Sequence, residues 1–127
     1  MIIQNIKIQN IRSYEFAELP INKGINAIYG NNGSGKTSLL EAIYFGLSLK
    51  SFRTSKTEQI IRNNELKGEI LITGAEKTIR SIKNKTNSKA IDENNEKKIA
   101  IKELLMLIPT CLIENKEFSF TYAQPDY

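Results

Sequence analysis

Residues 30–37 read Gly30-Asn31-Asn32-Gly33-Ser34-Gly35-Lys36-Thr37, and this stretch, the phosphate loop, fits G-x-x-x-x-G-K-[S/T] at every fixed position. A polyphosphate needs several N–H donors aimed at one point, and glycines let the backbone fold into such a concavity without side-chain clashes. In this pattern Lys36 supplies a mobile positive charge for the β- and γ-phosphates, and the Thr37 hydroxyl is placed to bind Mg²⁺. The stretch therefore predicts a site for a nucleoside triphosphate with its metal ion.

The flanking segments fit a loop of this kind, which must follow a strand and open a helix. Residues 25–29, entered through Gly24, alternate in a way that predicts a strand. Residues 36–49 have helical spacing, which predicts a helix that is buried on most sides. Its predicted apolar stripe consists of Leu39, Leu40, Ile43 and Leu47, widened by Ala42 and Phe45.

The other elements are weaker predictions from period and turn residues. Residues 2–9 and 14–19 predict half-buried strands, and residues 68–83 predict a hairpin with its turn near 74–76. Ser55 and Glu58 suggest a capping box for a short turn at 56–62. The composition of residues 84–96 predicts a long exposed loop, residues 101–108 a short helix and residues 110–114 a strand, whereas residues 115–127 have no clear period.

Composition narrows the class of protein. The chain has 127 residues, of which 40% are apolar and 25% charged, which suits one domain. No apolar run approaches the length of a membrane span, and the first residues lack the layout of a secretory signal, so a soluble cytoplasmic protein is expected. With no histidine and one cysteine, an internal disulfide, a Cys-rich zinc site and histidine catalysis are excluded for this stretch.

The net charge of +4 admits two interpretations. It suits a polyanionic partner, but 14 of the 18 basic residues are lysines in a sequence also rich in Ile and Asn, so we favour a solvated lysine surface as the explanation. Arginine, which grips phosphate best, occurs only four times.

Four residues outside the loop are candidates with competing interpretations. Arg12, after the first predicted strand, could reach a nucleotide phosphate or base, or be a surface arginine. Arg53 could serve DNA, nucleotide or solvent. Glu114 ends a short apolar run as an acidic catalytic residue would, but we interpret it as a decoy because Pro109 interrupts the run. Cys111 is expected to be a small buried core residue.

Several motifs together resemble the RecF family of bacterial recombination mediators. The opening stretch from Ile6 to Tyr14 resembles the family's strand and Arg-x-Tyr turn, and Gly30 to Tyr44 resembles its phosphate loop and helix. Ser51-Phe52-Arg53-Thr54 distinguishes RecF from general SMC-like heads, while Leu107-Ile108-Pro109 and Glu117-Phe118 fit the later pattern. The resemblance extends over essentially the whole chain.

The resemblance implies an α/β fold of the P-loop NTPase, ABC/SMC-like head type: an N-terminal lobe whose mixed sheet has antiparallel hairpins around the phosphate-loop helix. Residues 1–127 would form the N-terminal part of the head, with a hairpin insertion at about 68–83. The implied cofactors are ATP and Mg²⁺. The implied ATP-binding residues are Gly30, Asn31, Asn32, Gly33, Ser34, Gly35, Lys36, Thr37 and Arg12, with Thr37 also the metal ligand.

The resemblance also implies function and partners. These are single-stranded or gapped DNA, other recombination mediator proteins, and an ATP-dependent head-to-head dimer, in DNA replication, repair and the SOS response. The family's signature helix and second acidic motif have no counterpart in these residues, so we expect an N-terminal fragment that binds nucleotide weakly and does not hydrolyse it. The alternatives are a non-catalytic nucleotide-binding remnant or another P-loop protein, such as a small kinase or a nuclease head. The predicted hairpin after the helix favours the ABC-type head, because a kinase would continue with a parallel βαβ run.

Overall fold

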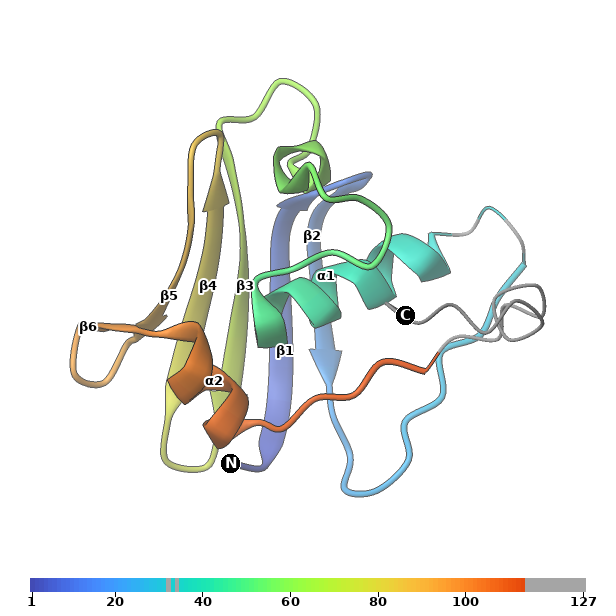
Figure 1. Cartoon of the computed structure of the whole chain (residues 1–127). Helices are drawn as coiled ribbons and strands as arrows, with labels where there is room; N and C mark the ends of the chain where they lie inside the picture. The colour runs from blue at the N-terminus through green and yellow to red at the C-terminus, as the bar shows by residue number, and fades with distance from the viewer. Residues whose placement is uncertain (32, 34, 114–127) are drawn as a thin grey trace, which may run out of the picture.

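The computed structural model describes residues 1–31, 33 and 35–113, which form one sheet with helices on one of its faces (Figure 1). The sheet has six strands in the order β2-β1-β3-β4-β5-β6, and every neighbouring pair is antiparallel. The strands are β1 (Ile3–Ile11), β2 (Tyr14–Pro20), β3 (Lys67–Gly74), β4 (Thr78–Asn84), β5 (Ser88–Asp92) and β6 (Lys97–Ile99). The helices are α1 (Lys36–Ser48), the 3₁₀ helix η1 (Thr57–Ile60) and α2 (Ile101–Leu107).

The first two predicted strands are present; β1 alternates as expected, whereas in β2 both Glu15 and Phe16 are exposed. In β1, Ile6 and Ile8 are buried while Lys7 between them is exposed, because successive side chains of a strand point to opposite faces. A two-residue turn, Arg12 and Ser13, joins β1 to β2. This turn is tied to the last residue of η1, since the Arg12 amide donates to the Ile60 carbonyl over 2.8 Å.

The hairpin predicted at 68–83 is present as β3 and β4, and its inward isoleucines form the middle of the core. Ile70 and Ile72 of β3 and Ile79 of β4 are fully buried beneath α1. The turn lies where it was expected, with the Gly74 amide donating to the Lys77 carbonyl over 2.8 Å.

The predicted loop at 84–96 is wrong, because it contains β5 and is followed at once by β6. The Asn84 side chain accepts hydrogen bonds from the amides of Thr86 and Asn87, over 3.0 and 2.8 Å, and so closes a tight turn after β4. The chain then pairs with β4 and turns Ala90 into the core, where it is fully buried. The strand was not predicted because it is short and most of its residues are polar.

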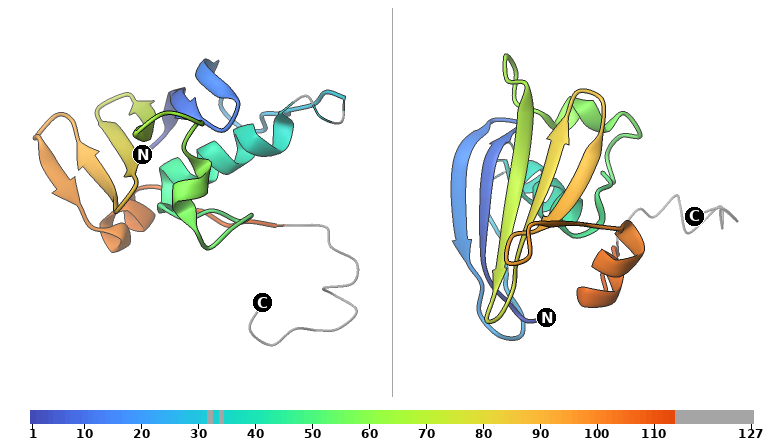
Figure 2. Two further views of the ribbon diagram at one scale, coloured as in Figure 1. Left: turned by 90° about the horizontal axis from the view of Figure 1, so that it is seen from above. Right: turned by 90° about the vertical axis from the view of Figure 1, so that its left-hand side faces the viewer.

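Helix α1 confirms the helix predicted at 36–49, but its buried side differs from the prediction. All three helices lie on the same face of the sheet, and α1 packs against β1, β3, β4 and α2 (Figure 2). Leu39, Ala42 and Phe45 face the sheet, whereas Leu40 is 46% exposed. From Glu41 to Ser48 every residue of the helix is buried or half-buried, so the expected burial on most sides is confirmed, and only the place of Leu40 is wrong.

The turn at η1 and the helix at α2 confirm the two short helical predictions. The capping box does not form: Lys56, not Ser55, occupies the N-cap position of η1, and no side chain caps it. Helix α2 buries Leu104, and its Leu107 carbonyl accepts a hydrogen bond of 3.0 Å from the amino group of Met1.

The strand predicted at 25–29 is absent, and this is the largest difference from expectation. Ile25 is 96% and Tyr29 is 90% exposed, and no described segment pairs with residues 25–29. Instead, the Asn26 side chain accepts from the Asn22 amide and donates to the Asn22 carbonyl, 2.9 and 2.8 Å away. Such local side-chain bonds close a turn in competition with strand formation.

The end of the described chain also departs from prediction. Residues 110–113 are not a strand, and Cys111 is exposed and not a core residue. With no described strand beside this segment, its backbone lacks the partners that a ladder needs. Glu114, the tail 115–127 and its Glu117-Phe118 pair lie outside the described residues, as do Asn32 and Ser34 of the phosphate loop.

Candidate nucleotide-binding site

The phosphate loop has backbone geometry that requires glycine at two positions. Gly33 and Gly35 have φ of +83° and +92°, in the left-handed region that L side chains rarely adopt. At Gly35 a Cβ would also lie 2.8 Å from the hydroxyl oxygen of Tyr14, which donates a hydrogen bond of 3.1 Å to the Gly35 carbonyl. The turn before α1 is therefore shaped by its glycines and held from β2.

Helix α1 begins directly at this turn, with Gly35 as its N-cap. The first intrahelical bond runs from the Leu39 amide to the Gly35 carbonyl, over 3.0 Å, so the amides ahead of Leu39 have no partner within the helix. No acidic residue stands in the first turn to offset the partial positive charge of the helix end. The loop therefore presents amide donors and positive potential to an anion.

The side chain of Lys36 folds back onto the phosphate loop. Its ammonium group donates to the carbonyl oxygens of Gly30 and Asn31, the second 3.1 Å away. These bonds hold the Lys36 side chain across the mouth of the turn. A bound phosphate would offer the ammonium group charged oxygens in exchange for neutral ones, and charge-assisted bonds are the stronger kind.

An open hollow of about 390 Å³ lies against the loop. In the described part of the chain it is lined by Ser13, Gly33, Gly35, Lys36, Thr37, Ser38 and Arg53. Thr37 is exposed on this wall, so its hydroxyl can ligate Mg²⁺, an ion that takes few protein ligands and keeps most of its water. The described residues include no cluster of three acidic or thiol groups that would form a metal site independent of nucleotide.

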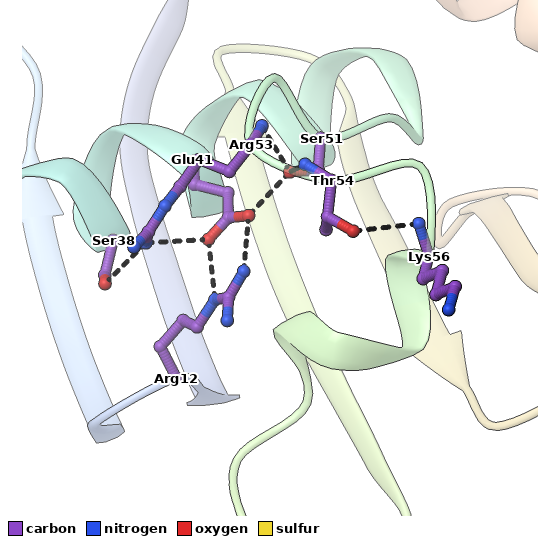
Figure 3. A network of polar contacts seen from close by, with 7 residues as sticks. All are labelled: Arg12, Ser38, Glu41, Ser51, Arg53, Thr54 and Lys56. Carbon is purple, nitrogen blue, oxygen red and sulfur yellow. Dashed lines mark hydrogen bonds and ion pairs between the residues drawn. The ribbon is translucent and has the colours of Figure 1, made fainter.

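A buried carboxylate, that of Glu41, lies on the side of α1 that faces Arg12 of the β1–β2 turn (Figure 3). The Glu41 side chain is fully buried and accepts two hydrogen bonds from Arg12, from Nε to Oε1 over 2.8 Å and from Nη2 to Oε2 over 3.0 Å. The Ser51 hydroxyl adds a third bond of 2.6 Å to Oε2. Through these bonds Glu41 joins the β1–β2 turn, helix α1 and the segment after the helix.

Opposing effects set the ionisation of this pair. Burial by itself raises the pKa of Glu41, but the hydrogen bonds from Arg12 and Ser51 and the charges of Arg12 and Arg53 outweigh it, so its pKa lies below the ordinary value. The hydrogen bond to Glu41 likewise raises the pKa of Arg12 against the effect of its own burial. Both groups are charged at neutral pH.

The structure separates the two candidate arginines. Arg12 is committed to Glu41 and lines a different depression, with Ser13 and Gln59, so its predicted contact with nucleotide stays a prediction. Arg53 reaches the hollow beside the phosphate loop, with Nη1 3.1 Å from the Ser38 hydroxyl. The sequence had suggested no role for Glu41, and Ser51 had been named only as part of the Ser51-Phe52-Arg53-Thr54 stretch. The signal available for Glu41 was an acidic residue inside an otherwise apolar helix face.

A glycine-shaped loop, a helix end and a lysine around one hollow are the features of the P-loop class of proteins, and comparison with known proteins agrees. The AAA domain family matches residues 5–123, so the chain belongs to that family. The predicted α/β fold of an ABC-type ATPase head is confirmed by the solved structures that it matches. No helix in the described ranges is long and apolar enough to cross a membrane.

The curated relatives confirm the resemblance to RecF. The chain is 34% identical over 135 residues to the DNA replication and repair protein RecF of Pseudoalteromonas translucida, a match that covers 98% of this chain and 35% of that protein. It is 30% identical to RecF of Clostridium tetani, over 100% of this chain and 36% of the relative. The chain thus spans about a third of the length of these relatives.

Two solved structures of the recombination mediator protein RecF, with ATP and with ATPrS, are similar in three dimensions. Their TM-scores are 0.66 and 0.67 at 29% identity. The matches cover 81% and 82% of this chain, and 29% of each solved chain. The likeness therefore includes most of the described fold.

Proposed function

We propose that this chain is the ATP-binding part of a RecF-like DNA replication and repair protein. The observation that carries the proposal is the turn through Gly33 and Gly35, which opens with Lys36 onto a hollow of about 390 Å³. That hollow is large enough for a polyphosphate and is bordered by donors. RecF itself, the similar protein, has been solved with ATP.

The residues of the phosphate loop, 30–37, would hold the nucleotide's phosphates. Backbone amides at the start of α1 would donate to phosphate oxygens, and Lys36 would neutralise charge on the β- and γ-phosphates. The Thr37 hydroxyl would ligate Mg²⁺, which when bound neutralises negative charge on the phosphates. For Arg12 we propose an indirect part: it fixes Glu41, and through it the wall of the hollow.

We further propose that the 127 residues alone bind nucleotide without hydrolysing it. A general base must be free to accept a proton within reach of the reacting water. Glu41 is unsuited, because its carboxylate oxygens are occupied by Arg12, Arg53 and Ser51, and its pKa lies below the ordinary range. Steady-state ATP turnover that disappears in Lys36→Ala would contradict this.

The wider role extends the same proposal. We place the chain in the cytoplasm, in the DNA damage and SOS responses. There it acts with single-stranded or gapped DNA and recombination mediator proteins, and pairs head to head when ATP is bound. Support comes from relatives that are DNA replication and repair proteins and from RecF's place in the RecFOR pathway. Residues 1–127 would be the N-terminal part of the ATPase head.

Nucleotide binding is tested by thermal shift with Mg·ATP. The unaltered chain is expected to melt at a higher temperature as ATP is raised, because a ligand that binds only the folded state stabilises it. Lys36→Ala should abolish the shift, whereas Lys85→Ala removes an equal charge from an exposed turn and should keep it. An equal shift in Lys36→Ala and the unaltered chain would mean that the loop is not the site.

A further inference from the structure

We propose that Arg53 is a second cationic contact for the nucleotide's phosphates, and that Ser38 and Glu41 hold it at the hollow. The inference rests on the proposed function, since it concerns the same site. Lys36 is the cation that the loop motif supplies. Arg53 comes from the segment after α1, and no position of the loop motif specifies it.

The position of Arg53 is fixed by two contacts of one nitrogen (Figure 3). Nη1 donates to the Ser38 hydroxyl over 3.1 Å and to Glu41 Oε1 over 3.4 Å. Ser38 follows Thr37 in the first turn of α1, and Arg53 and Thr37 line the same hollow. Among the described residues only Nη1 has an acceptor, so the rest of the guanidinium can donate to a ligand.

The charges around Glu41 do not balance, which is the second line of evidence. One buried carboxylate faces two guanidinium groups. Arg12 takes the strong, two-point contact at 2.8 and 3.0 Å, and Arg53 has a single contact at 3.4 Å. Arg12 therefore neutralises most of the carboxylate, and Arg53 keeps a surplus positive charge beside the phosphate loop. A dianionic or trianionic group is the natural partner for that surplus.

The backbone of Arg53 is also held in place. The Ser51 hydroxyl accepts hydrogen bonds from the amides of Arg53 and Thr54, over 3.0 and 3.3 Å, while donating to Glu41. These bonds close a turn, and the turn holds the backbone of Arg53 in a fixed position next to α1. A cation held in position before binding costs less entropy to order than a free one.

The test is calorimetric titration of the chain with Mg·ATP and, separately, with inorganic tripolyphosphate. Arg53→Ala is expected to weaken both by about tenfold, the usual size of a lost charge-assisted contact at a partly exposed site. Arg53→Lys should recover part of the loss, because it restores the positive charge but not the planar guanidinium group with its several donors. Lys56→Ala, in the same segment but outside the hollow, should bind as the unaltered chain does.

A double variant tests the part assigned to Glu41. Glu41→Gln should weaken ATP binding in the unaltered chain and have little further effect once Arg53 is alanine, if Glu41 acts by positioning Arg53. Circular dichroism confirms that each variant is folded before titration.

Two results would overturn the inference. One is equal affinity of Arg53→Ala and the unaltered chain for both ligands. The other is a loss confined to ATP, which would place Arg53 on the sugar or base. Failure of the proposed function is distinct from either, since it would appear as Lys36→Ala binding ATP normally.

Discussion

The two arms of the phosphate loop differ in how they are held. The downstream arm, α1, buries Ala42 and Phe45 against the sheet and is tied at its first turns to β2 and to the Arg12 turn. The upstream arm, residues 22–31, has no strand partner in the described chain and leaves Ile25 and Tyr29 almost fully exposed. Both arms border the same phosphate loop, but only the downstream arm is packed against the sheet.

This difference teaches that the anion-binding part of the loop depends on its helix side. Glycine turns and helix amides are short-range features, and they are formed here with the upstream arm unpaired. The expected strand at 25–29 is a long-range feature, because a strand is stable only beside another strand. Substitutions in the two arms should therefore have unequal effects on stability.

The largest effect is expected from Phe45→Ala, which truncates a fully buried ring in the downstream arm. Loss of the buried surface and the cavity left behind should lower the free energy of unfolding by about 4 kcal/mol. Urea denaturation followed by circular dichroism measures it. A loss below about 1 kcal/mol would mean that α1 is not packed on the sheet as described.

A smaller effect is expected from Glu41→Gln, which leaves Arg12 without its charge partner. At neutral pH the free energy of unfolding should fall by about 2 kcal/mol, towards the low side for a broken buried pair because both arginines keep part of their hydration.

The same variant makes a prediction about pH. Because the pKa of Glu41 is lower in the folded chain than its unfolded value of 4.5, unfolding takes up a proton in acid. The stabilisation is complete above pH 4.5 and is lost as pH falls through the folded-state pKa. Urea midpoints of the two proteins should converge over that acid range, and a gap that widens towards low pH would contradict the ion pair.

The smallest effect is expected from Tyr29→Ala in the upstream arm, an aromatic truncation matched to Phe45→Ala. Since the Tyr29 side chain is 90% exposed, the free energy of unfolding should change by less than about 0.5 kcal/mol. The same urea titration serves as the measurement. A loss comparable to that of Phe45→Ala would indicate that residues 25–29 are packed after all.

The sequence was sufficient for features that depend on neighbours along the chain. The glycine positions of the loop, helix α1, the β3–β4 hairpin and the first two strands follow from turn residues and period, and each is present. The sequence was insufficient for elements that form only when a partner strand, distant along the chain, lies beside them. Strand β5 forms because β4 offers an edge, and residues 25–29 do not form a strand because Asn26 binds Asn22 locally and no described segment lies alongside.

The candidate site divides in the same way. The motif alone predicted that Lys36 and Thr37 belong to one site, and both line the hollow. The network of Arg12, Glu41 and Arg53 could not be predicted, because it joins three segments that are separated in the sequence and meet only in the fold. The helix period also placed Leu40 in the core, although the sheet covers one side of α1 only.

The most direct test of the central claim is to follow backbone amide resonances of the ¹⁵N-labelled chain during titration with Mg·ATP. If the turn and the helix end hold the phosphates, the amides of Gly33, Gly35, Lys36 and Thr37 should shift first and furthest, while those of β5 and β6 stay in place. Saturable shifts confined to other parts of the chain, with these four amides unmoved, would contradict the account.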